Sequence, residues 1–172
     1  MNFNNIISNL NFVNIKNVSF KEIMKLLKIR NKENIRNKMF SNKYITKLEH
    51  ILWSNKIKKA TIEAFFLIYY KDILCGGLGI KNFDSKIREC DWAFYISDKI
   101  NFPGLGASIE LKSINFLFKK YKLSRINCYV LKDNQSVVNL HSKFFFSIVP
   151  LKENKLHNYN ISMSKNNVIK LC

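Results

Sequence analysis

The sequence is poor in the residues that build metal centres, disulfide frameworks and flexible linkers. It has four cysteines, two prolines and five glycines among 172 residues. The cysteines form no CxxC pair, so we expect neither a metal cluster nor a set of disulfides. The longest apolar run, residues 64–70, is far too short to cross a bilayer, and the first residues lack the basic segment of a signal peptide. We therefore expect a cytoplasmic protein without a bound metal.

Acidic residues are also scarce. The chain has 12 aspartates and glutamates against 29 lysines and arginines, which gives a net charge of +17. A surplus of this size favours an anionic partner, and nucleic acid, acidic lipid and phosphate-rich small molecules all qualify. A general compositional drift toward lysine explains the charge equally well, so charge by itself does not choose among these partners.

The chain does contain enough apolar material for one folded core. Hydrophobic residues make up 47% of it and aromatic residues 13%, which is typical of globular rather than disordered chains. We expect a single domain over residues 1–172, with a core over residues 12–163 and a basic C-terminal tail. No internal repeat or linker interrupts it.

Hydrophobic periodicity predicts an α+β fold. Helices are expected after Ser19 and Thr46, each of which has a glutamate three residues later and so can form a capping box. Two more are expected after the glycines at 104–106 and after Asn134. Strands are predicted at 12–15, 63–70, 73–83, 88–97, 125–131, 144–148 and 157–163. This order predicts one mixed, mostly antiparallel sheet of about six or seven strands, flanked by about four helices.

A glycine-rich turn joins the aromatic strand predicted at 88–97 to an amphipathic helix. The turn is Pro103-Gly104-Leu105-Gly106. Glycines permit a close approach of the backbone, and the free N–H groups of a first helical turn attract anions. The arrangement favours a phosphate-binding turn, and a tight turn without a ligand is the alternative at this point.

Several segments, taken in order, resemble the Gcn5-related N-acetyltransferase (GNAT) superfamily. They are the strand, the Gly-x-Gly turn, the helix, the next strand, and the pattern Asn-x-x-Val-x-x-Leu-His-x-Lys-x-x-Phe over residues 134–146. Within the superfamily, residues 12–163 resemble the acetyltransferases of pseudaminic acid biosynthesis. The narrower resemblance rests on Arg30-Asn31, Met39, His50 and the segments 90–95, 103–106 and 129–134.

The resemblance implies an acetyl-CoA-dependent N-acetyltransferase in which the amine attacks the thioester directly. The implied acceptor is the 4-amino group of a UDP-linked 4-amino-4,6-dideoxy-N-acetyl-altrosamine. For acetyl-CoA, the resemblance implies backbone contacts to the acetyl group, a turn for the pyrophosphate, an amide for the pantetheine and a lysine. The acetyl group would contact the backbone of Phe94, Tyr95 and Ile96, and the pyrophosphate would contact the turn of Phe102, Pro103, Gly104, Leu105, Gly106 and Ala107. The pantetheine would bind the Asn134 amide, and Lys143 is the lysine. For the acceptor they are Arg30, Asn31, Met39, His50 and Lys81.

One position departs from the superfamily in a way that bears on mechanism. Many members carry a tyrosine as general acid where this chain has His141. Its imidazole can supply either a neutral N–H donor or a full proton to the departing thiolate. We expect its partner to be the CoA sulfur rather than a protein carboxylate, and an exposed histidine without a role is the alternative. Tyr95 is the second catalytic candidate, and water is expected to act as the general base.

Two other functions stay open. The first is a related acetyltransferase that acts on a protein N-terminus or on another amine. The second is a basic nucleic-acid-binding protein that shares the fold, although the chain lacks a recognition-helix signature and an RNP-like aromatic pattern. We expect no membrane insertion, and the sequence is compatible with a monomer or a homodimer.

Overall fold

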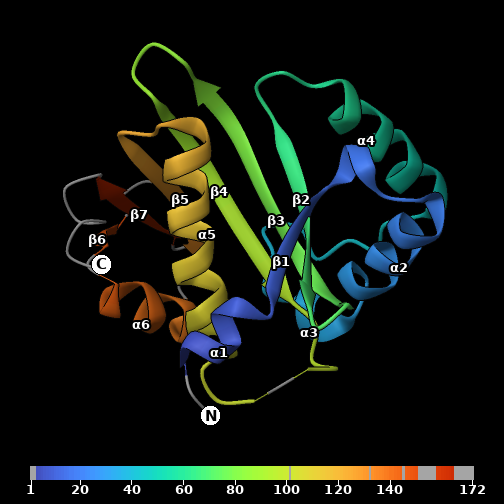
Figure 1. Cartoon of the computed structure of the whole chain (residues 1–172), viewed down its shortest axis with the longest axis horizontal. Helices are drawn as coiled ribbons and strands as arrows, with labels where there is room; N and C mark the ends of the chain where they lie inside the picture. The colour runs from blue at the N-terminus through green and yellow to red at the C-terminus, as the bar shows by residue number, and fades with distance from the viewer. Residues whose placement is uncertain (1–2, 101, 132, 145, 151–157, 165–172) are drawn as a thin grey trace.

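A seven-stranded sheet forms the centre of the molecule, and helices cover both of its faces (Figure 1). The computed structural model describes residues 3–100, 102–131, 133–144, 146–150 and 158–164, so the predicted basic tail lies outside the described residues. The elements are α1 (Phe3–Ser8), β1 (Leu10–Asn14), a 3₁₀ turn (Ile15–Asn17), α2 (Phe20–Arg30), α3 (Glu33–Arg36), α4 (Lys47–Lys59), β2 (Ala64–Tyr70), β3 (Ile73–Asp84), β4 (Glu89–Ile96), α5 (Leu105–Tyr121), β5 (Arg125–Leu131), α6 (Gln135–Lys143), β6 (Ser147–Pro150) and β7 (Asn158–Ser164).

The sheet has the strand order β1-β2-β3-β4-β5-β7-β6. All neighbouring pairs are antiparallel except β4 and β5, which run parallel. The predicted α+β class and the mixed, mostly antiparallel sheet are therefore confirmed. In the described part of the chain no helix is long and apolar enough to span a membrane.

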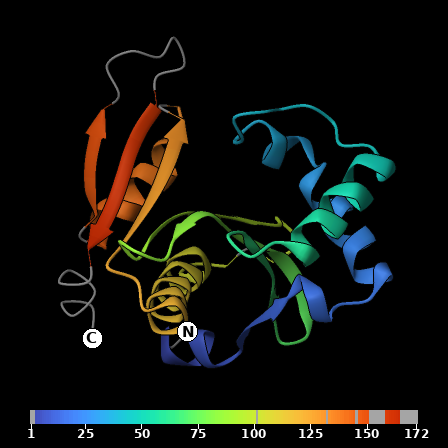
Figure 2. The same ribbon diagram turned by 90° about the horizontal axis from the view of Figure 1, so that it is seen from above.

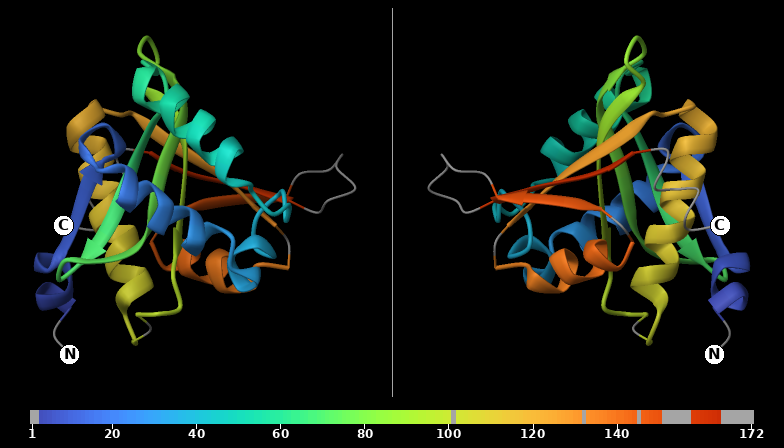
Figure 3. Two further views of the ribbon diagram at one scale, coloured as in Figure 1. Left: turned by 90° about the vertical axis from the view of Figure 1, so that its right-hand side faces the viewer. Right: turned by 90° about the vertical axis from the view of Figure 1, so that its left-hand side faces the viewer.

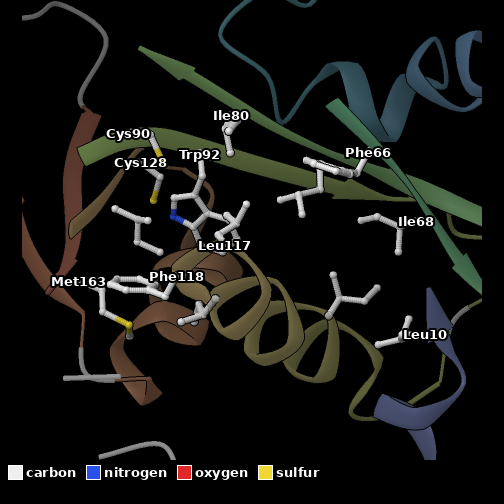
Figure 4. Close-up of a cluster of buried hydrophobic side chains, with 14 of the residues drawn as sticks. Leu10, Phe66, Ile68, Ile80, Cys90, Trp92, Leu117, Phe118, Cys128 and Met163 are labelled. Carbon is white, nitrogen blue, oxygen red and sulfur yellow. The ribbon is translucent and has the colours of Figure 1, made fainter. Parts of the chain in front are cut away.

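Two apolar layers hold the helices against the sheet. On β2, Phe66 and Ile68 face α5, whereas the residue between them, Leu67, faces α2 and α4, as the alternation of side chains along a strand requires. Figures 2 and 3 show α5 on one face of the sheet and α2 with α4 on the other. In the larger core, Trp92 and Leu117 are buried where the sheet meets α5 (Figure 4).

The predicted helix starts are confirmed at α2 and α4. The amide of Glu22 donates to Ser19 Oγ at 3.3 Å, and the carboxylate of Glu22 accepts from the Ser19 amide at 2.9 Å. Thr46 and Glu49 make the same reciprocal pair. Each box satisfies helix N–H groups that would otherwise lack partners.

Two short helices, α1 and α3, were not predicted. They contain six and four residues, which is too few for helical periodicity to stand out. The first contains two asparagines, and asparagine favours caps and turns over helix interiors. Both helices depend on tertiary packing, because Ile6 and Ile35 are buried.

The glycines of β3 mark a β-bulge. Ile68 faces Gly76 and Tyr69 faces Leu74, so Cys75 is the extra residue. A Cβ on Gly76 would lie 2.0 Å from the Tyr95 carbonyl oxygen. A Cβ on Gly77 would collide with the Phe65 ring, so at these two positions the backbone is approached by the protein itself and not by a ligand.

Replacing Gly76 with alanine is therefore expected to destabilise the fold. Its Cβ would meet backbone atoms of β4, which cannot rotate away, and overpacking of this kind costs about 1–3 kcal/mol or more. Urea unfolding would measure the loss. Gly79→Ala is the matched control, since its Cβ would lie 3.3 Å from a movable Phe65 side chain. Equal midpoints for Gly76→Ala and wild type would contradict this account.

Candidate active site

The parallel strands β4 and β5 pair over only three residues and then separate. Glu89, Cys90 and Asp91 pair with residues 125–127. From Trp92 to Ile96, the only strand among the described residues that pairs with β4 is β3. In Figure 2 the strands β5, β7 and β6 rise away from the rest of the sheet. Within the described part of the chain, the edge of β4 that faces this opening has N–H and C=O groups without a sheet partner, which an extended ligand with amide bonds could satisfy.

A cavity of about 390 Å³ fills the opening between the strands. We call it the splay cavity. Its walls are the diverging parts of β4 and β5, one face of α6 from Ser136 to His141, Gly106 of α5 and the segment around α3. The lining residues are Asn34, Ile35, Lys38, Met39, Phe40, Trp92, Ala93, Phe94, Tyr95, Ile96, Gly106, Cys128, Tyr129, Val130, Leu131, Asn134, Ser136, Val137, Leu140 and His141.

The predicted glycine turn opens α5 at the edge of this cavity. Gly104 is the N-cap residue and has φ of +91°, a left-handed conformation that favours glycine. Gly106 lines the cavity, and a Cβ there would lie 3.9 Å from Ile96 Cδ1 and 4.0 Å from Leu140 Cδ2. These are ordinary contacts, so protein packing does not require a glycine at 106. The missing side chain instead leaves space on the cavity side.

Other residues of the turn have different surroundings. Phe102 packs its ring against Tyr70, with the centroids 5.2 Å apart, and Leu105 is buried in the core. Both side chains hold the turn in place, and the buried Leu105 leaves only its backbone groups for a ligand. Ala107 follows in the first turn of α5, where amide groups lack helical partners.

A buried histidine forms part of the cavity wall on α6. His141 is 3% exposed, and its Nδ1 lies 2.6 Å from Glu110 Oε1 on α5. Its Nε2 lies 3.5 Å from Cys128 Sγ on β5. The rings of Phe146 and Trp92 flank it, with centroids 4.7 and 5.9 Å away. The expectation that His141 has no protein carboxylate as partner is wrong, and so is the alternative of an exposed histidine.

Burial governs the electrostatics of the groups around His141. It raises the pKa of the Glu110 carboxyl, while the hydrogen bond from His141 works in the opposite direction. Burial also raises the pKa of the Cys128 thiol, and the charge of Glu110 adds to that effect. The cysteine therefore stays protonated at neutral pH.

A second cavity of about 630 Å³ lies on the other side of β4. We call it the α4 cavity, because α4 forms its outer wall opposite strands β2 to β4. The residues that line both cavities are Met39, Phe40, Trp92, Ala93, Phe94, Tyr95 and Tyr129. The two cavities therefore meet at the middle of β4, where a group held in one can reach a group held in the other.

The α4 cavity has an apolar wall and charged residues of both signs: the cations are Arg30 and Lys81, and the carboxylates are Glu49 and Asp91. Trp53 and Phe65 meet edge to face, with ring centroids 5.0 Å apart. Arg30 is half-buried: its Nη2 donates to the Ser41 carbonyl at 3.2 Å, and its buried Nη1 has no hydrogen-bond partner among the described residues. Lys81 lines the same cavity and is exposed. Burial lowers the pKa of Arg30 and raises that of Tyr95.

Four further residues expected at the site have distinct positions. His50 lines the α4 cavity, but it is buried and its Nε2 contacts the Ile23 carbonyl at 3.1 Å, so it also ties α4 to α2. Asn31 lines neither cavity, because its amide exchanges two hydrogen bonds with the backbone of Ile45. Asn134 is the N-cap residue of α6 without a side-chain capping bond, and it lines the splay cavity. Lys143 is exposed at the end of α6, outside both cavities.

Sequence reasoning missed Glu110 and Cys128. A signal for Glu110 was present, because it shares one face of α5 with the buried residues Ser113 and Leu117 at helical spacing. A carboxylate on the apolar face of a helix needs a buried partner. Cys128 alternates with Ile126 and Val130, so it was indistinguishable from other core residues. No group of three or more potential metal ligands occurs in the part of the chain that the structure describes.

Comparison with known proteins gives consistent matches. The model of the acetyltransferase (GNAT) domain family matches residues 12–162. Acetyltransferase PseH of Campylobacter jejuni subsp. jejuni serotype O:23/36 (strain 81-176) is 27% identical over 135 residues, which cover 78% of this chain and 83% of that protein.

Solved structures share the fold at low sequence identity. The crystal structure of Campylobacter jejuni N-acetyltransferase PseH in complex with acetyl coenzyme A superposes with a TM-score of 0.71 at 19% identity, covering 91% of this chain and 99% of that one. Spermidine N-acetyltransferase from Vibrio cholerae in complex with CoA and spermine superposes with a TM-score of 0.82 at 15% identity, covering 94% and 99%.

Proposed function

Because the chain belongs to the acetyltransferase (GNAT) domain family, we propose that it transfers an acetyl group from acetyl-CoA to the 4-amino group of a UDP-linked amino-dideoxy sugar. The observation that carries this proposal is the meeting of two cavities on β4. One cavity is bordered by a glycine turn and by an edge of β4 that has no sheet partner among the described residues. The other is lined by the cations Arg30 and Lys81 together with the carboxylates Glu49 and Asp91. A direct transfer between two bound substrates needs such a junction, because orientation supplies a large share of the rate.

Acetyl-CoA fits the splay cavity in this proposal. The amide-containing pantetheine would lie along the free edge of β4, near Phe94, Tyr95 and Ile96, with the Asn134 side chain beside it. The pyrophosphate would meet the first-turn amides of α5 beside Gly106. A relative with this fold has been solved with acetyl coenzyme A bound.

The acetyl transfer follows from this placement. The acceptor amine, neutral after losing a proton to water, enters from the α4 cavity and its nitrogen forms a bond to the thioester carbon. A β4 backbone N–H stabilises the developing oxyanion, because it is held rigidly by the β3–β4 ladder. The oxyanion then re-forms the carbonyl as the carbon–sulfur bond breaks, and the CoA thiolate takes a proton from His141 Nε2. The new amide nitrogen loses its extra proton to solvent. Tyr95 lines both cavities and is the second donor within reach of their junction.

The acceptor class is inferred from the α4 cavity. Arg30 has a buried nitrogen without a partner and Lys81 stands at the rim, so a diphosphate would find two cations there. The apolar wall of Trp53, Phe65 and Met39 suits a sugar with few hydroxyl groups. Narrow recognition of one sugar, and any contribution of His50, rest on the resemblance to PseH.

Removing the Arg30 guanidinium is expected to raise the KM for the acceptor by about 10- to 150-fold, since a charged hydrogen bond contributes about 1.5–3 kcal/mol. Affinity for CoA, measured by calorimetry, is expected to stay at the wild-type value, because Arg30 does not line the splay cavity. Lys119→Ala, an exposed lysine near the end of α5, controls for the change in net charge. A weaker affinity for CoA in Arg30→Ala would place Arg30 in the other pocket and remove the argument for a diphosphate.

An acceptor panel tests the function itself. The protein is incubated with acetyl-CoA and, separately, UDP-4-amino-4,6-dideoxy-N-acetyl-altrosamine, spermidine, a peptide with a free N-terminus and a UDP-sugar without the amine. Mass spectrometry is expected to show one added acetyl group on the amino-sugar nucleotide alone. Preferred acetylation of spermidine or of the peptide would overturn the proposed acceptor. Binding to RNA that ignores CoA and falls steeply with salt would instead favour the nucleic-acid alternative.

A further inference from the structure

The carboxylate of Glu110 occupies an unusual position for a structural residue. Its side chain is fully buried in the middle of α5. Oε1 has one partner, His141 Nδ1 at 2.6 Å, and the buried Oε2 has no hydrogen-bond partner among the described residues. A buried carboxylate with an unsatisfied oxygen lowers the stability of a fold. A leucine at this position would fill the core without that cost, so the pair is better explained by chemistry than by packing.

The same contact fixes the direction of the imidazole. With Nδ1 held by Glu110 and with Phe146 and Trp92 against the ring, the histidine cannot turn freely about its side-chain bonds. The other nitrogen, Nε2, is then directed toward Cys128 Sγ at 3.5 Å, and both of these residues line the splay cavity. A sulfur atom of the protein itself thus already lies within reach of Nε2, as the CoA sulfur must in the transfer.

We propose that Glu110 is a positioning residue for acetyl transfer, which holds His141 through Nδ1 and keeps a proton on Nε2 for the departing thiolate. This inference rests on the proposed function of the splay cavity and deepens it. Glu110 itself does not line the cavity and touches no substrate; it acts through the imidazole.

The proton balance of the pair explains how this works. When the pair holds two protons, one lies between Glu110 and Nδ1, and the other is on Nε2. As the bond between the acetyl carbon and sulfur breaks, sulfur keeps the electron pair and takes the Nε2 proton. The remaining proton settles on Nδ1, which donates to the Glu110 carboxylate, and the imidazole leaves the step neutral. Solvent then returns one proton to Nε2 before the next turnover.

Every titratable group around the pair must be considered before a pH effect is assigned. Glu110 faces the ring from α5, and Cys128 faces it from β5. Asp91 on β4 acts on Cys128 over a longer range. The contacts from β4 and from residue 146 are the uncharged Trp92 and Phe146 rings. Burial raises the pKa of Glu110 and keeps Cys128 a thiol, so Cys128 does not compete as the proton donor.

The test replaces the charge of Glu110 while keeping its shape. In Glu110→Gln the amide still bonds Nδ1, but no carboxylate favours the doubly protonated pair. We expect kcat at pH 7.5 to fall by on the order of 10- to 100-fold, less than for loss of the proton donor itself. In the wild type we expect kcat to fall as the pH rises between about 6 and 9, and in Glu110→Gln this fall should occur at lower pH. Affinity for CoA and KM for the acceptor should stay near wild type.

Two further variants make the result decisive. Glu110→Asp restores a carboxylate on a side chain one methylene shorter. The pH at which kcat falls is expected to lie between the values for Glu110→Gln and the wild type. Ser113→Ala removes a buried hydroxyl one turn along the same helix, which has no partner among the described residues. It should leave the pH profile unchanged. A Glu110→Gln enzyme with the wild-type profile, whatever its thermal stability, would overturn the proposal and leave Glu110 with a packing role only.

An NMR titration of the histidine rings in the CoA-free protein separates this inference from the proposed function. The His141 signals, assigned by comparison with His141→Asn, are expected to titrate at lower pH in Glu110→Gln than in wild type. Equal midpoints in the two proteins would reject the Glu110–His141 coupling. A wild-type protein that acetylates no member of the acceptor panel would reject the proposed function, while the coupling would still stand or fall by the titration.

Discussion

Replacing His141 with alanine is expected to lower kcat by about 100- to 10,000-fold, the range in which a general acid contributes. The reason is geometric. Nε2 lies 3.5 Å from Cys128 Sγ, and both residues line the splay cavity. Without it, the CoA thiolate must leave without a proton or take one from a donor that is less well placed. Affinity for CoA should change little, because backbone groups of β4 and α5 supply most of the expected contacts.

The alanine variant also leaves Glu110 buried without the one hydrogen-bond partner it has among the described residues, so a loss of activity could follow from a damaged fold. His141→Asn is the matched control, because its amide nitrogen stands close to the position of Nδ1 and can still donate to Glu110. We expect it to melt near the wild-type temperature and yet to lose kcat as the alanine variant does. His141→Tyr should recover part of the rate, since a phenol restores a donor of the type common in the superfamily.

The dependence of kcat on pH distinguishes the donors. A protonated imidazole can give its proton only below the pKa of the Glu110–His141 pair, so kcat of the wild type should fall as pH rises through that pKa. A tyrosine donor keeps its proton across the neutral range, so His141→Tyr should lose the falling limb. An alanine variant with wild-type kcat from pH 6 to 9 would refute the role of His141 and leave proton delivery to solvent or to Tyr95.

Local signals predicted much of the fold. Ser19 and Thr46 begin α2 and α4 as their capping boxes indicate, because the two bonds of each box involve residues only three apart. The turn at Lys71 and Asp72 joins β2 to β3 with both residues at positive φ, as a two-residue hairpin requires. Residues 125–131 form β5 with the predicted bounds.

The site itself depends on contacts that sequence periodicity does not contain. Glu110 and His141 are 31 positions apart, and each looks ordinary within its own helix. The opening between β4 and β5 depends on where their pairing stops, and nothing in either strand marks Asp91 as the last paired residue. Asn31 was expected to bind the acceptor, yet its side-chain amide makes two hydrogen bonds with the backbone of Ile45. A short polar side chain often bonds to a nearby backbone group in this way.

The glycine turn yields the second large effect, because Gly106 lies beside the space expected for the cofactor. Gly106→Val is expected to weaken CoA binding by more than about 100-fold, and calorimetry with CoA and with acetyl-CoA would measure the loss. A Cβ at this position meets only Ile96 and Leu140, at 3.9 and 4.0 Å. The protein can therefore accept the new side chain, which will fill the cavity and cover the first-turn amides that would otherwise reach the pyrophosphate.

Substitutions at the two glycines of the turn should therefore have different effects: one at Gly106 should lower the affinity for CoA, and one at Gly104 should lower the stability of the fold. Gly106→Val should unfold at nearly the wild-type urea concentration, because the residue lies in a helix with ordinary backbone angles and room for a Cβ. Gly104→Ala should show the opposite pattern, with reduced stability, because φ of +91° strains any residue that carries a Cβ. Gly106→Ala should fall between valine and wild type in affinity. If Gly106→Val binds CoA as tightly as wild type does, the cofactor does not pass this turn, and the splay cavity loses its assignment to acetyl-CoA.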